Sequence, residues 1–424
     1  MLGSKLVQAL KLGLLAATAT LALGLAGCEK KTDAPANTGG TPAKKETTGG
    51  TAPAGDAAPA PADAAKPGDE IVIGHYGSLT GNQATFGKST DNGIKLAVDE
   101  ANAAGGVEVN GKKHKIKLVS DDTEGKADKA GTVVTKLITK DKVVAVLGEV
   151  ASKVSLQGAP VCQEFGVPMI TPSSTNSEVT KVGDMIFRVC YIDPFQGKAA
   201  ATFVQKDLKL TKVALLFDQS GSYSVGLKDE FSKAFRASGG TIVSEQAYNE
   251  GDPDFSAQLT RIREANPEAI FVPGYYSEVA KIAIQGRKLG LTVPLIGGDG
   301  WDSEELGKNA KDAIEGCFYS NHYAPDQATP EITEFVSKYQ KAYGGIPDGL
   351  AALGYDAAKI LFASMSRAKS LKGTDLRDAI AATKDFKGVT GSITLNADRD
   401  AVKPVVMVER KGGEWRFRAT IAPE

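Results

Sequence analysis

The sequence has 424 residues, of which 42% are hydrophobic, and it carries 50 basic against 51 acidic side chains. This balance argues against a broad basic surface for nucleic acid, and four cysteines in so long a chain exclude a disulfide scaffold. Three scattered histidines, His75, His114 and His322, leave little for a His-based metal site or a catalytic triad, so we expect neither metal nor cofactor.

Residues 1–28 are predicted to be a lipoprotein signal peptide. Lys5 and Lys11 precede an apolar run over residues 12–25, which is too short for a comfortable membrane span but suits a signal peptide. The run ends in Leu-Ala-Gly-Cys28, which resembles the bacterial lipobox, whose Cys is lipidated and becomes the first mature residue. A buried N-terminal helix with a chance Cys is the alternative. Lipid chains on Cys28 would anchor the protein without spanning the membrane.

Residues 29–69 are predicted to be a disordered tether. Apart from Ala, they include no hydrophobic residue, and they carry Pro at six positions among Gly, Thr, Ala and Lys. The segment has no apolar side chains large enough to offset, by their burial, the entropy that the backbone would lose on ordering. A flexible coil of this length reaches roughly 30–40 Å on average. We interpret the segment as a spacer, with contact to peptidoglycan as the alternative.

From residue 70 onward, short β-branched runs alternate with helical patterns. The first series of predicted strands covers residues 71–78, 115–120, 143–148, 167–171 and 186–191, with helices at 87–104, 127–140 and 152–165. The second has strands at 212–217, 241–247, 269–274, 293–297 and 314–320, with helices at 223–237, 255–265 and 279–289. The remainder is predicted as helices at 331–343 and 350–368, then strands at 388–396, 403–409 and 415–421.

Alternating strands and helices predict parallel sheets flanked by helices, joined by right-handed crossovers. Two such series in one chain indicate two lobes rather than a single oversized core. The fold class is therefore α/β and two-lobed.

The turn over residues 81–89 is similar to a phosphate-binding P-loop, because it follows a strand and opens a helix. A P-loop has four residues between its glycines, whereas five separate Gly81 from Gly87, so successive N–H groups could not wrap a phosphate. We find no partner acid for Mg²⁺, no nucleophile elbow and no HExxH motif. A nucleotide enzyme or cleft hydrolase is thus disfavoured, and we expect no enzyme.

The other strand-to-helix turns are rich in small hydroxylic and aromatic residues, at the carboxyl ends of strands where open α/β sheets bind ligands. Ser152 opens a predicted helix, either as an N-cap or as a contact for a ligand carboxylate. Thr175 follows the next strand and offers a hydroxyl and a backbone N–H. Asp299 lies in a glycine-rich turn beside Trp301, where it is either a structural turn residue or a ligand contact.

Several stretches together are similar to a known family. They are the helix and loop from Gly81 to Gly106, the stretches 121–123, 146–148, 170–176, 218–223 and 274–276, and Gly316. Over residues 71–409 the chain resembles the leucine/isoleucine/valine-binding family of type I periplasmic substrate-binding proteins of ABC transporters. This resemblance implies the Venus flytrap architecture, with three hinge crossings near residues 191–195, 320–324 and 397–403. Lobe one would comprise residues 70–192 plus 323–400, and lobe two residues 193–322 plus 401–424.

The resemblance also implies an amino-acid site shared by both lobes. Ser152 and Thr175, with nearby N–H groups and the Ser174 carbonyl, would hold the α-carboxylate and part of the ammonium. A zwitterion needs donors at one end and an acid at the other.

Four further positions complete the implied site. Tyr223 and Tyr275 match aromatic positions that close over the ligand from lobe two, and Phe86 matches an aromatic wall for its side chain. Asp299 matches an acidic position, commonly Glu, that pairs with the α-ammonium. Asp in place of Glu shortens this group by one methylene.

The cysteines depart from part of the family, in which a disulfide would need Cys near Glu124 and Ala151. Cys162, Cys190 and Cys317 form an odd set once Cys28 is lipidated. Cys162 and Cys190 could form a bridge in an oxidising compartment, or the thiols could be buried and free.

The resemblance implies an extracytoplasmic protein, periplasmic or on the cell surface, that is lipid-anchored to a bacterial membrane. It would capture an amino acid of the branched-chain type between its lobes and deliver it to an ABC permease. The alternative is a ligand-sensing receptor domain of the same fold for an amino acid, an amide or a related small molecule. The sequence does not identify the ligand.

Overall fold

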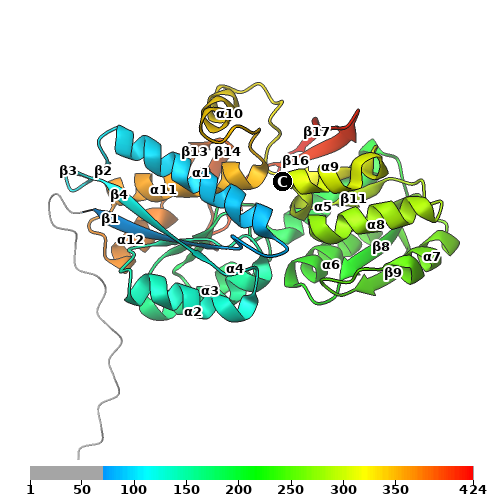
Figure 1. Ribbon diagram of the computed structural model, residues 1–424, viewed down its shortest axis with the longest axis horizontal. Coiled ribbons are helices and arrows are strands. Elements are labelled where there is room, and N and C mark those ends of the chain that lie inside the picture. The colour runs from blue at the N-terminus through cyan, green and yellow to red at the C-terminus, as the bar shows by residue number, and fades with distance from the viewer. Residues whose placement is uncertain (1–69, 424) are drawn as a thin grey trace, which may run out of the picture. The chain divides into compact units, whose positions relative to one another are not determined.

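A computed structural model describes residues 70–423. The predicted signal peptide with Cys28 and the predicted tether lie outside the described residues. Two large sheets organise the described part of the chain (Figure 1), one with strand order β4-β1-β5-β6-β7 and one with order β17-β16-β12-β11-β10-β8-β9. We call each sheet with its covering helices a lobe.

The first lobe is built on a sheet that is parallel throughout. Its strands are β1 (Ile71–Gly77), β4 (Ile116–Asp122), β5 (Val146–Leu147), β6 (Met169–Thr171) and β7 (Ile186–Arg188). Side chains alternate between the faces, as the two-residue period of a strand requires. Ile71 and Ile73 pack with helices α1 (Ala84–Ala103) and α11 (Gly349–Arg367), whereas Tyr76 packs with α2 (Ala127–Thr139) and α3 (Ser152–Phe165).

The second lobe repeats this plan. Its parallel strands are β8 (Lys212–Asp218), β9 (Thr241–Tyr248), β10 (Ala269–Phe271), β11 (Leu295–Gly297) and β12 (Phe318–Asn321), followed by antiparallel β16 (Val405–Lys411) and β17 (Glu414–Ile421). Leu215 packs with α5 (Asp193–Thr202) and α6 (Ser222–Ala237). On the opposite face, Leu216 packs with α7 (Ser256–Glu264), α8 (Tyr276–Lys288) and α9 (Glu304–Ala310).

Smaller elements complete the lobes. They are the hairpin β2 (Val107–Val109) and β3 (Lys112–His114), the helices α4 (Glu178–Lys181), α10 (Pro330–Tyr343) and α12 (Gly373–Ala381), the short helical turns η1 (Phe203–Asp207), η2 (Asp299–Trp301) and η3 (Lys311–Ile314), and the strands β13 (Phe386–Gly388), β14 (Gly391–Leu395) and β15 (Ala401–Val402). Helix α10 packs on α1 and α11, and Ile393 of β14 lies in the core of the first lobe.

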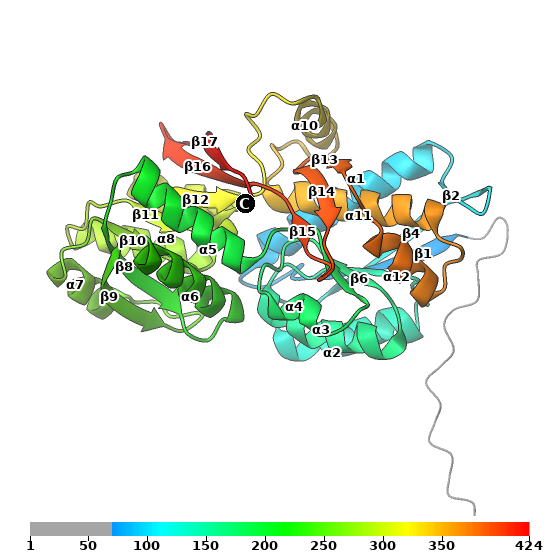
Figure 2. The same cartoon turned by 180° about the vertical axis from the view of Figure 1, so that it is seen from behind.

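The chain passes between the lobes at three crossings, which join β7 to α5, β12 to α10, and β15 to β16. Figure 2 shows the last of them from behind, where β14 and β15 lie by the first lobe and the chain continues into β16 of the second. The predicted two-lobed α/β fold with three crossings is confirmed. The predicted residue bounds of the two lobes stay a prediction.

The predicted strands and helices of both series are present, but several strands end early. The sequence predicts strands to residues 148, 191 and 274, whereas β5, β7 and β10 end at Leu147, Arg188 and Phe271. The remaining residues leave the sheet to form the turns and crossings. Helix α5 was not predicted, because its buried face consists mostly of Ala and Gly and shows no apolar period. These small residues allow close packing, since a Cβ on Gly197 would meet the Phe231 backbone nitrogen at 2.6 Å.

Cys162, Cys190 and Cys317 are buried free thiols in the described chain, so the possible Cys162–Cys190 bridge is not formed. Burial raises the pKa of the Cys190 thiol to about 12 and that of Cys162 further still. Within residues 70–423, no helix is long and apolar enough to cross a bilayer, and no cluster of His, Cys, Asp and Glu could hold a metal ion.

Candidate ligand site between the two lobes

The predicted site residues lie in turns that follow the carboxyl ends of parallel strands. In the first sheet β1 lies between β4 and β5, and in the second β8 lies between β9 and β10, so strand order reverses about each of them. Such switch points are where open α/β sheets form crevices. Here the two crevices contribute to one small cavity, which is lined by Phe86, Val150, Ser152, Ser173, Tyr223, Tyr275, Asp299, Gly300 and Leu350.

The structure brings five of the seven predicted ligand contacts into this cavity, namely Phe86, Ser152, Tyr223, Tyr275 and Asp299. Ser174 and Thr175 do not line it, whereas the neighbouring Ser173 does. Sequence reasoning also missed Val150, Gly300 and Leu350. Val150 and Gly300 adjoin predicted turns, but only the tertiary fold brings Leu350, at the start of α11, to the same place.

Ser152 is the first residue of α3, and the N-cap position belongs to Ala151, which has no capping side chain. The first N–H groups of a helix lack intrahelical acceptors, so this turn presents donors as well as a hydroxyl. The Ser152 side chain is buried, and its Oγ accepts a hydrogen bond of 3.3 Å from the Asn176 N–H. Ser152 therefore acts as a bridge between the turns after β5 and β6, and not as an N-cap.

Glu149 holds the turn before Ser152 in place. Its buried carboxylate accepts hydrogen bonds from Ser78 Oγ (2.6 Å), the Ala151 N–H (2.6 Å) and Thr123 Oγ1 (3.3 Å). Burial raises the pKa of Glu149, although these donors oppose the shift. The sequence did carry a signal for this residue, namely an acid directly after a buried strand.

The turn after β6 directs its three hydroxyl residues differently. Ser174 Oγ lies 2.9 Å from both the Glu149 and the Val150 carbonyl oxygens, between which its single proton is shared, and the Ser174 carbonyl accepts from Arg188 Nη1 (2.5 Å). The Ser174 carbonyl is thus occupied by a buried guanidinium. By contrast, the hydroxyls of Ser173 and Thr175 are buried without a hydrogen-bond partner among the described residues.

The aromatic residues form one wall of the cavity. The Tyr223 and Tyr275 rings stack with centroids 5.3 Å apart and an angle of 6° between their planes. Phe86, from the first lobe, meets Tyr275 edge to face at 5.5 Å and Tyr276 at 5.0 Å. Such contacts add to the burial of apolar area. The wall therefore joins the two lobes.

Asp299 lies in the short helical turn after β11, with its side chain buried and both carboxylate oxygens in polar contacts. Its Oδ1 accepts from Gln196 Nε2 (2.8 Å) and from the Tyr223 hydroxyl (2.9 Å), and its Oδ2 lies 3.1 Å from His322 Nε2. The glycines before it are required by packing, since a Cβ on Gly298 would lie 2.3 Å from the Tyr223 hydroxyl oxygen. Asp299 is thus more than a surface turn residue.

Trp301 follows Asp299 but does not line the cavity. Its ring is fully buried, and its Nε1 donates to the Val272 carbonyl at 3.0 Å. A Cβ on Gly297 would lie 2.1 Å from this ring, so the Trp301 ring packs directly against the backbone that precedes Asp299.

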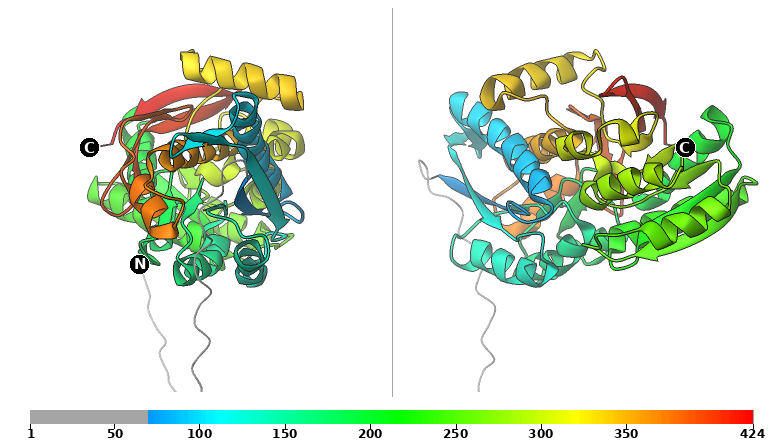
Figure 3. Two further views of the ribbon diagram at one scale, coloured as in Figure 1. Left: turned by 90° about the vertical axis from the view of Figure 1, so that its left-hand side faces the viewer. Right: turned by 45° about the vertical axis from the view of Figure 1, so that its right-hand side comes forward.

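Hydrogen bonds close the lobes on each other around the cavity. The Tyr276 hydroxyl donates to the Asn82 carbonyl (2.8 Å), Thr85 Oγ1 lies 3.0 Å from Ser303 Oγ, and Asn176 Nδ2 donates to the Ser222 carbonyl (2.8 Å). Figure 3 shows the start of α1 beside the helices of the second lobe. The cavity measures about 10 Å³, room for one water at most.

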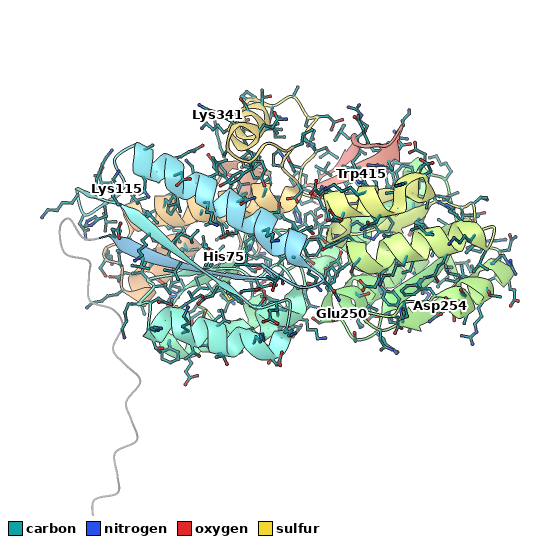
Figure 4. The ribbon with its side chains drawn as sticks, viewed as in Figure 1. His75, Lys115, Glu250, Asp254, Lys341 and Trp415 are labelled. Atoms are coloured by element: carbon teal, nitrogen blue, oxygen red, sulfur yellow. The ribbon has the colours of Figure 1, made fainter. Side chains whose placement is uncertain are left out.

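A larger, charged cavity of about 610 Å³ lies at the rim, lined by Asn82, Gln83, Lys126, Lys153, Glu250 and neighbouring residues of both lobes. Glu250, labelled in Figure 4, accepts from Gln83 Nε2 (3.3 Å) and lies 3.6 Å from Lys153 Nζ. The Lys153–Glu250 ion pair is partly exposed and therefore contributes little energy.

Comparisons with known proteins agree with this fold. The profile of the family described as "Periplasmic binding protein" matches residues 70–414. Leu/Ile/Val-binding protein homolog 2 of Brucella abortus (strain 2308) is 33% identical over 82% of this chain and 92% of its own.

Solved structures of similar proteins extend the comparison. The leucine-binding protein LivK of Thermotoga maritima is 39% identical, with a TM-score of 0.79 over 83% of this chain and 99% of its own. The branched-chain amino acid transporter substrate-binding protein LivJ of Streptococcus pneumoniae, solved with isoleucine, is 33% identical, with a TM-score of 0.77 over 84% and 99%. A solute-binding protein of an ABC transporter from R. palustris, solved with benzoate, is 25% identical, with a TM-score of 0.74 over 84% and 97%.

All of these relatives are binding proteins, in agreement with the prediction that the chain is not an enzyme. The chain belongs to the periplasmic binding protein family, as an extracytoplasmic substrate-binding protein of the branched-chain amino acid ABC transporter type.

Proposed function

We propose that this protein captures an amino acid with a branched aliphatic side chain in the cavity between its lobes and delivers it to an ABC permease. One observation carries the proposal, namely that Ser152 and Asp299 line the same cavity from opposite lobes. Donors at one end and an acid at the other match the two charges of a zwitterion. Isoleucine in the similar LivJ structure supports this ligand class.

The carboxylate of the ligand would be held at the start of α3. Ser152 offers its hydroxyl there, beside N–H groups that lack intrahelical acceptors. We keep Thr175 as a predicted contact because its buried hydroxyl has no partner in the described chain. Ser173 lines the cavity and would add a further hydroxyl for the carboxylate, whereas the Ser174 carbonyl, which the resemblance implied as a contact, already accepts from Arg188.

The side chain of the ligand would face the apolar part of the cavity. Phe86, Val150 and Leu350 provide only carbon atoms there, so a charged side chain would lose its hydration without compensation. Burying an aliphatic side chain of the size of Leu contributes about 1.5–3 kcal/mol. This contribution favours leucine, isoleucine or valine over polar amino acids.

Binding requires the cavity to open and close again. A cavity of about 10 Å³ cannot admit an amino acid, so the lobes must open at the crossings or the lining side chains must move. A ligand that touches both lobes favours the closed state by the free energy of those contacts. The closed, loaded form would then dock on the permease.

Membrane attachment is proposed from the sequence alone. The motif at Cys28 supports a lipid anchor, and residues 29–69 supply a flexible spacer between the anchor and the lobes. Metabolic labelling with a radioactive fatty acid tests this, since a Cys28→Ser variant should lose the label and leave the membrane fraction.

Isothermal titration calorimetry of the purified protein tests the ligand. We expect saturable binding of L-leucine, L-isoleucine and L-valine, and weaker binding of L-glutamine, L-lysine and benzoate. Tight benzoate binding without amino-acid binding would contradict the proposal.

Uptake of radiolabelled leucine tests delivery. A strain of the source bacterium that lacks this protein should take up less leucine at submicromolar concentration, and the wild-type gene should restore uptake. A sensory receptor domain would bind the same ligand, but its loss would leave uptake unchanged.

A further inference from the structure

The hydrogen bonds to the Asp299 carboxylate are unevenly divided between its two oxygens. A carboxylate offers about four lone-pair sites over its two oxygens. Gln196 and Tyr223 both donate to Oδ1, while His322 alone contacts Oδ2. The remaining acceptor capacity therefore lies on Oδ2, in a residue that lines the cavity.

His322 is built to be a fixed donor. It lies directly after β12 in the second crossing, and its side chain is 1% exposed. Its ring stacks on Tyr191 of the first crossing, with centroids 3.9 Å apart and an interplanar angle of 21°. Nδ1 has no partner among the described residues, while Nε2 faces a carboxylate that can only accept, so the proton belongs on Nε2. Burial lowers the pKa of His322 to about 4, which keeps the ring neutral near pH 7.

Gln196 is the corresponding donor to the other carboxylate oxygen of Asp299, Oδ1. It lies in α5, immediately after the first crossing, and its side chain is fully buried. Its Nε2 donates to Asp299 Oδ1 (2.8 Å) and to Ser320 Oγ at the end of β12 (2.9 Å). The Asp299 side chain is thus restrained by Gln196 and His322. Both residues lie next to crossings and outside the turn that carries Asp299.

We infer that His322 and Gln196 are positioning residues that orient Asp299, leaving one site on Oδ2 open to a ligand ammonium, and that they set the selectivity for amino acids over acids without an amine. The inference rests on the proposed function. Without His322, the Asp299 carboxylate could rotate about its Cβ–Cγ bond, and Oδ2 could then accept a hydrogen bond from another protein group. The effect should then be confined to the ammonium end of the ligand.

The test compares L-leucine with 4-methylpentanoate, the same molecule without its amine, by calorimetric titration. His322→Phe keeps a ring on Tyr191 and removes the donor. We expect L-leucine to bind about 10-fold or more weakly to this variant, while 4-methylpentanoate binding changes less than about 2-fold. His322→Gln, which can restore a donor, should recover part of the loss.

A matched control is Tyr191→Phe, which alters the same stack but removes a hydroxyl without a hydrogen-bond partner in the described chain. It should leave both affinities within about 2-fold of the wild type. Gln196→Met gives a second, independent variant, with a smaller loss for L-leucine because Tyr223 still donates to Oδ1.

The outcomes separate the two claims. If wild-type protein binds no amino acid, the proposed function fails, and this inference fails with it. If the wild type binds L-leucine but folded His322→Phe and Gln196→Met lose both ligands equally, or lose neither, only the positioning role is overturned. Thermal melting of each variant establishes that it is folded.

Discussion

The two halves of the cavity are built in different ways. In the first lobe, the turns after β5 and β6 contact each other through short hydroxyl side chains and backbone groups, with Glu149 at their centre. In the second lobe, Asp299 is held by the side chains of Gln196, Tyr223 and His322, from three other elements. The part of the site proposed for the ligand carboxylate is built from two neighbouring turns, whereas the part proposed for the ammonium depends on side chains distant in the sequence. Mutations in the two parts should therefore have different effects on binding.

Asp299 should show the largest effect on binding. Replacing it with Asn removes the charge that pairs with a buried ammonium, a change that costs about 2–5 kcal/mol at comparable buried pairs. We expect L-leucine affinity to fall accordingly in calorimetric titration, while 4-methylpentanoate affinity falls much less. Equal affinity for L-leucine in the variant and the wild type would remove Asp299 from the site.

Glu149 should show the largest effect on folding in the first half. Glu149→Ala leaves Ser78 Oγ, Thr123 Oγ1 and the Ala151 N–H without their buried acceptor. We expect the free energy of unfolding in urea to fall by about 2–4 kcal/mol. Glu149→Gln keeps the volume and one acceptor oxygen, so it should lose less. A Glu149→Ala protein as stable as the wild type would mean that the turn is held by other contacts.

Ser152 should show a moderate effect on both ligands. Ser152→Ala removes one hydroxyl donor to a carboxylate, which costs about 1.5–3 kcal/mol of binding free energy. Because L-leucine and 4-methylpentanoate share the carboxylate, both should weaken together, unlike the response to Asp299→Asn. Loss of L-leucine binding alone would place the ligand the other way round.

The pH dependence of stability offers a smaller test, centred on Asp193 at the first crossing. Burial takes this carboxyl out of water and raises its pKa to about 8. Its ordinary pKa is about 3.9. Between these values the folded protein binds a proton that the unfolded chain releases, so Asp193 makes stability fall as pH rises, by roughly 1 kcal/mol per pH unit near pH 7.

Asp193→Asn should remove this slope. Urea unfolding at pH 6, 7 and 8 should show the difference in stability between variant and wild type growing with pH in favour of the variant. A difference that is constant with pH would show that Asp193 titrates in its ordinary range.

The sequence predicted most of the fold because most strands and helices of both lobes show a clear apolar pattern, whereas the buried face of α5, mostly Ala and Gly, shows none. The strand-to-helix turns pointed to Ser152 and Asp299, and the family resemblance added Tyr223, Tyr275 and Phe86; all five line the cavity. The sequence could not provide His322 or Leu350, because the first lies in a crossing and the second opens a helix far along the chain. The family resemblance implied a contact from the Ser174 carbonyl, whereas Ser173 lines the cavity and the Ser174 carbonyl accepts from Arg188, a contact that no local sequence pattern shows.

The most direct test of the account is a crystal structure of the protein with L-leucine bound. We expect the ligand carboxylate within hydrogen-bond distance of Ser152 Oγ, the ammonium within that distance of Asp299 Oδ2, and the side chain against Phe86 and Leu350. A ligand bound outside this cavity, or one whose ammonium does not contact Asp299, would contradict it.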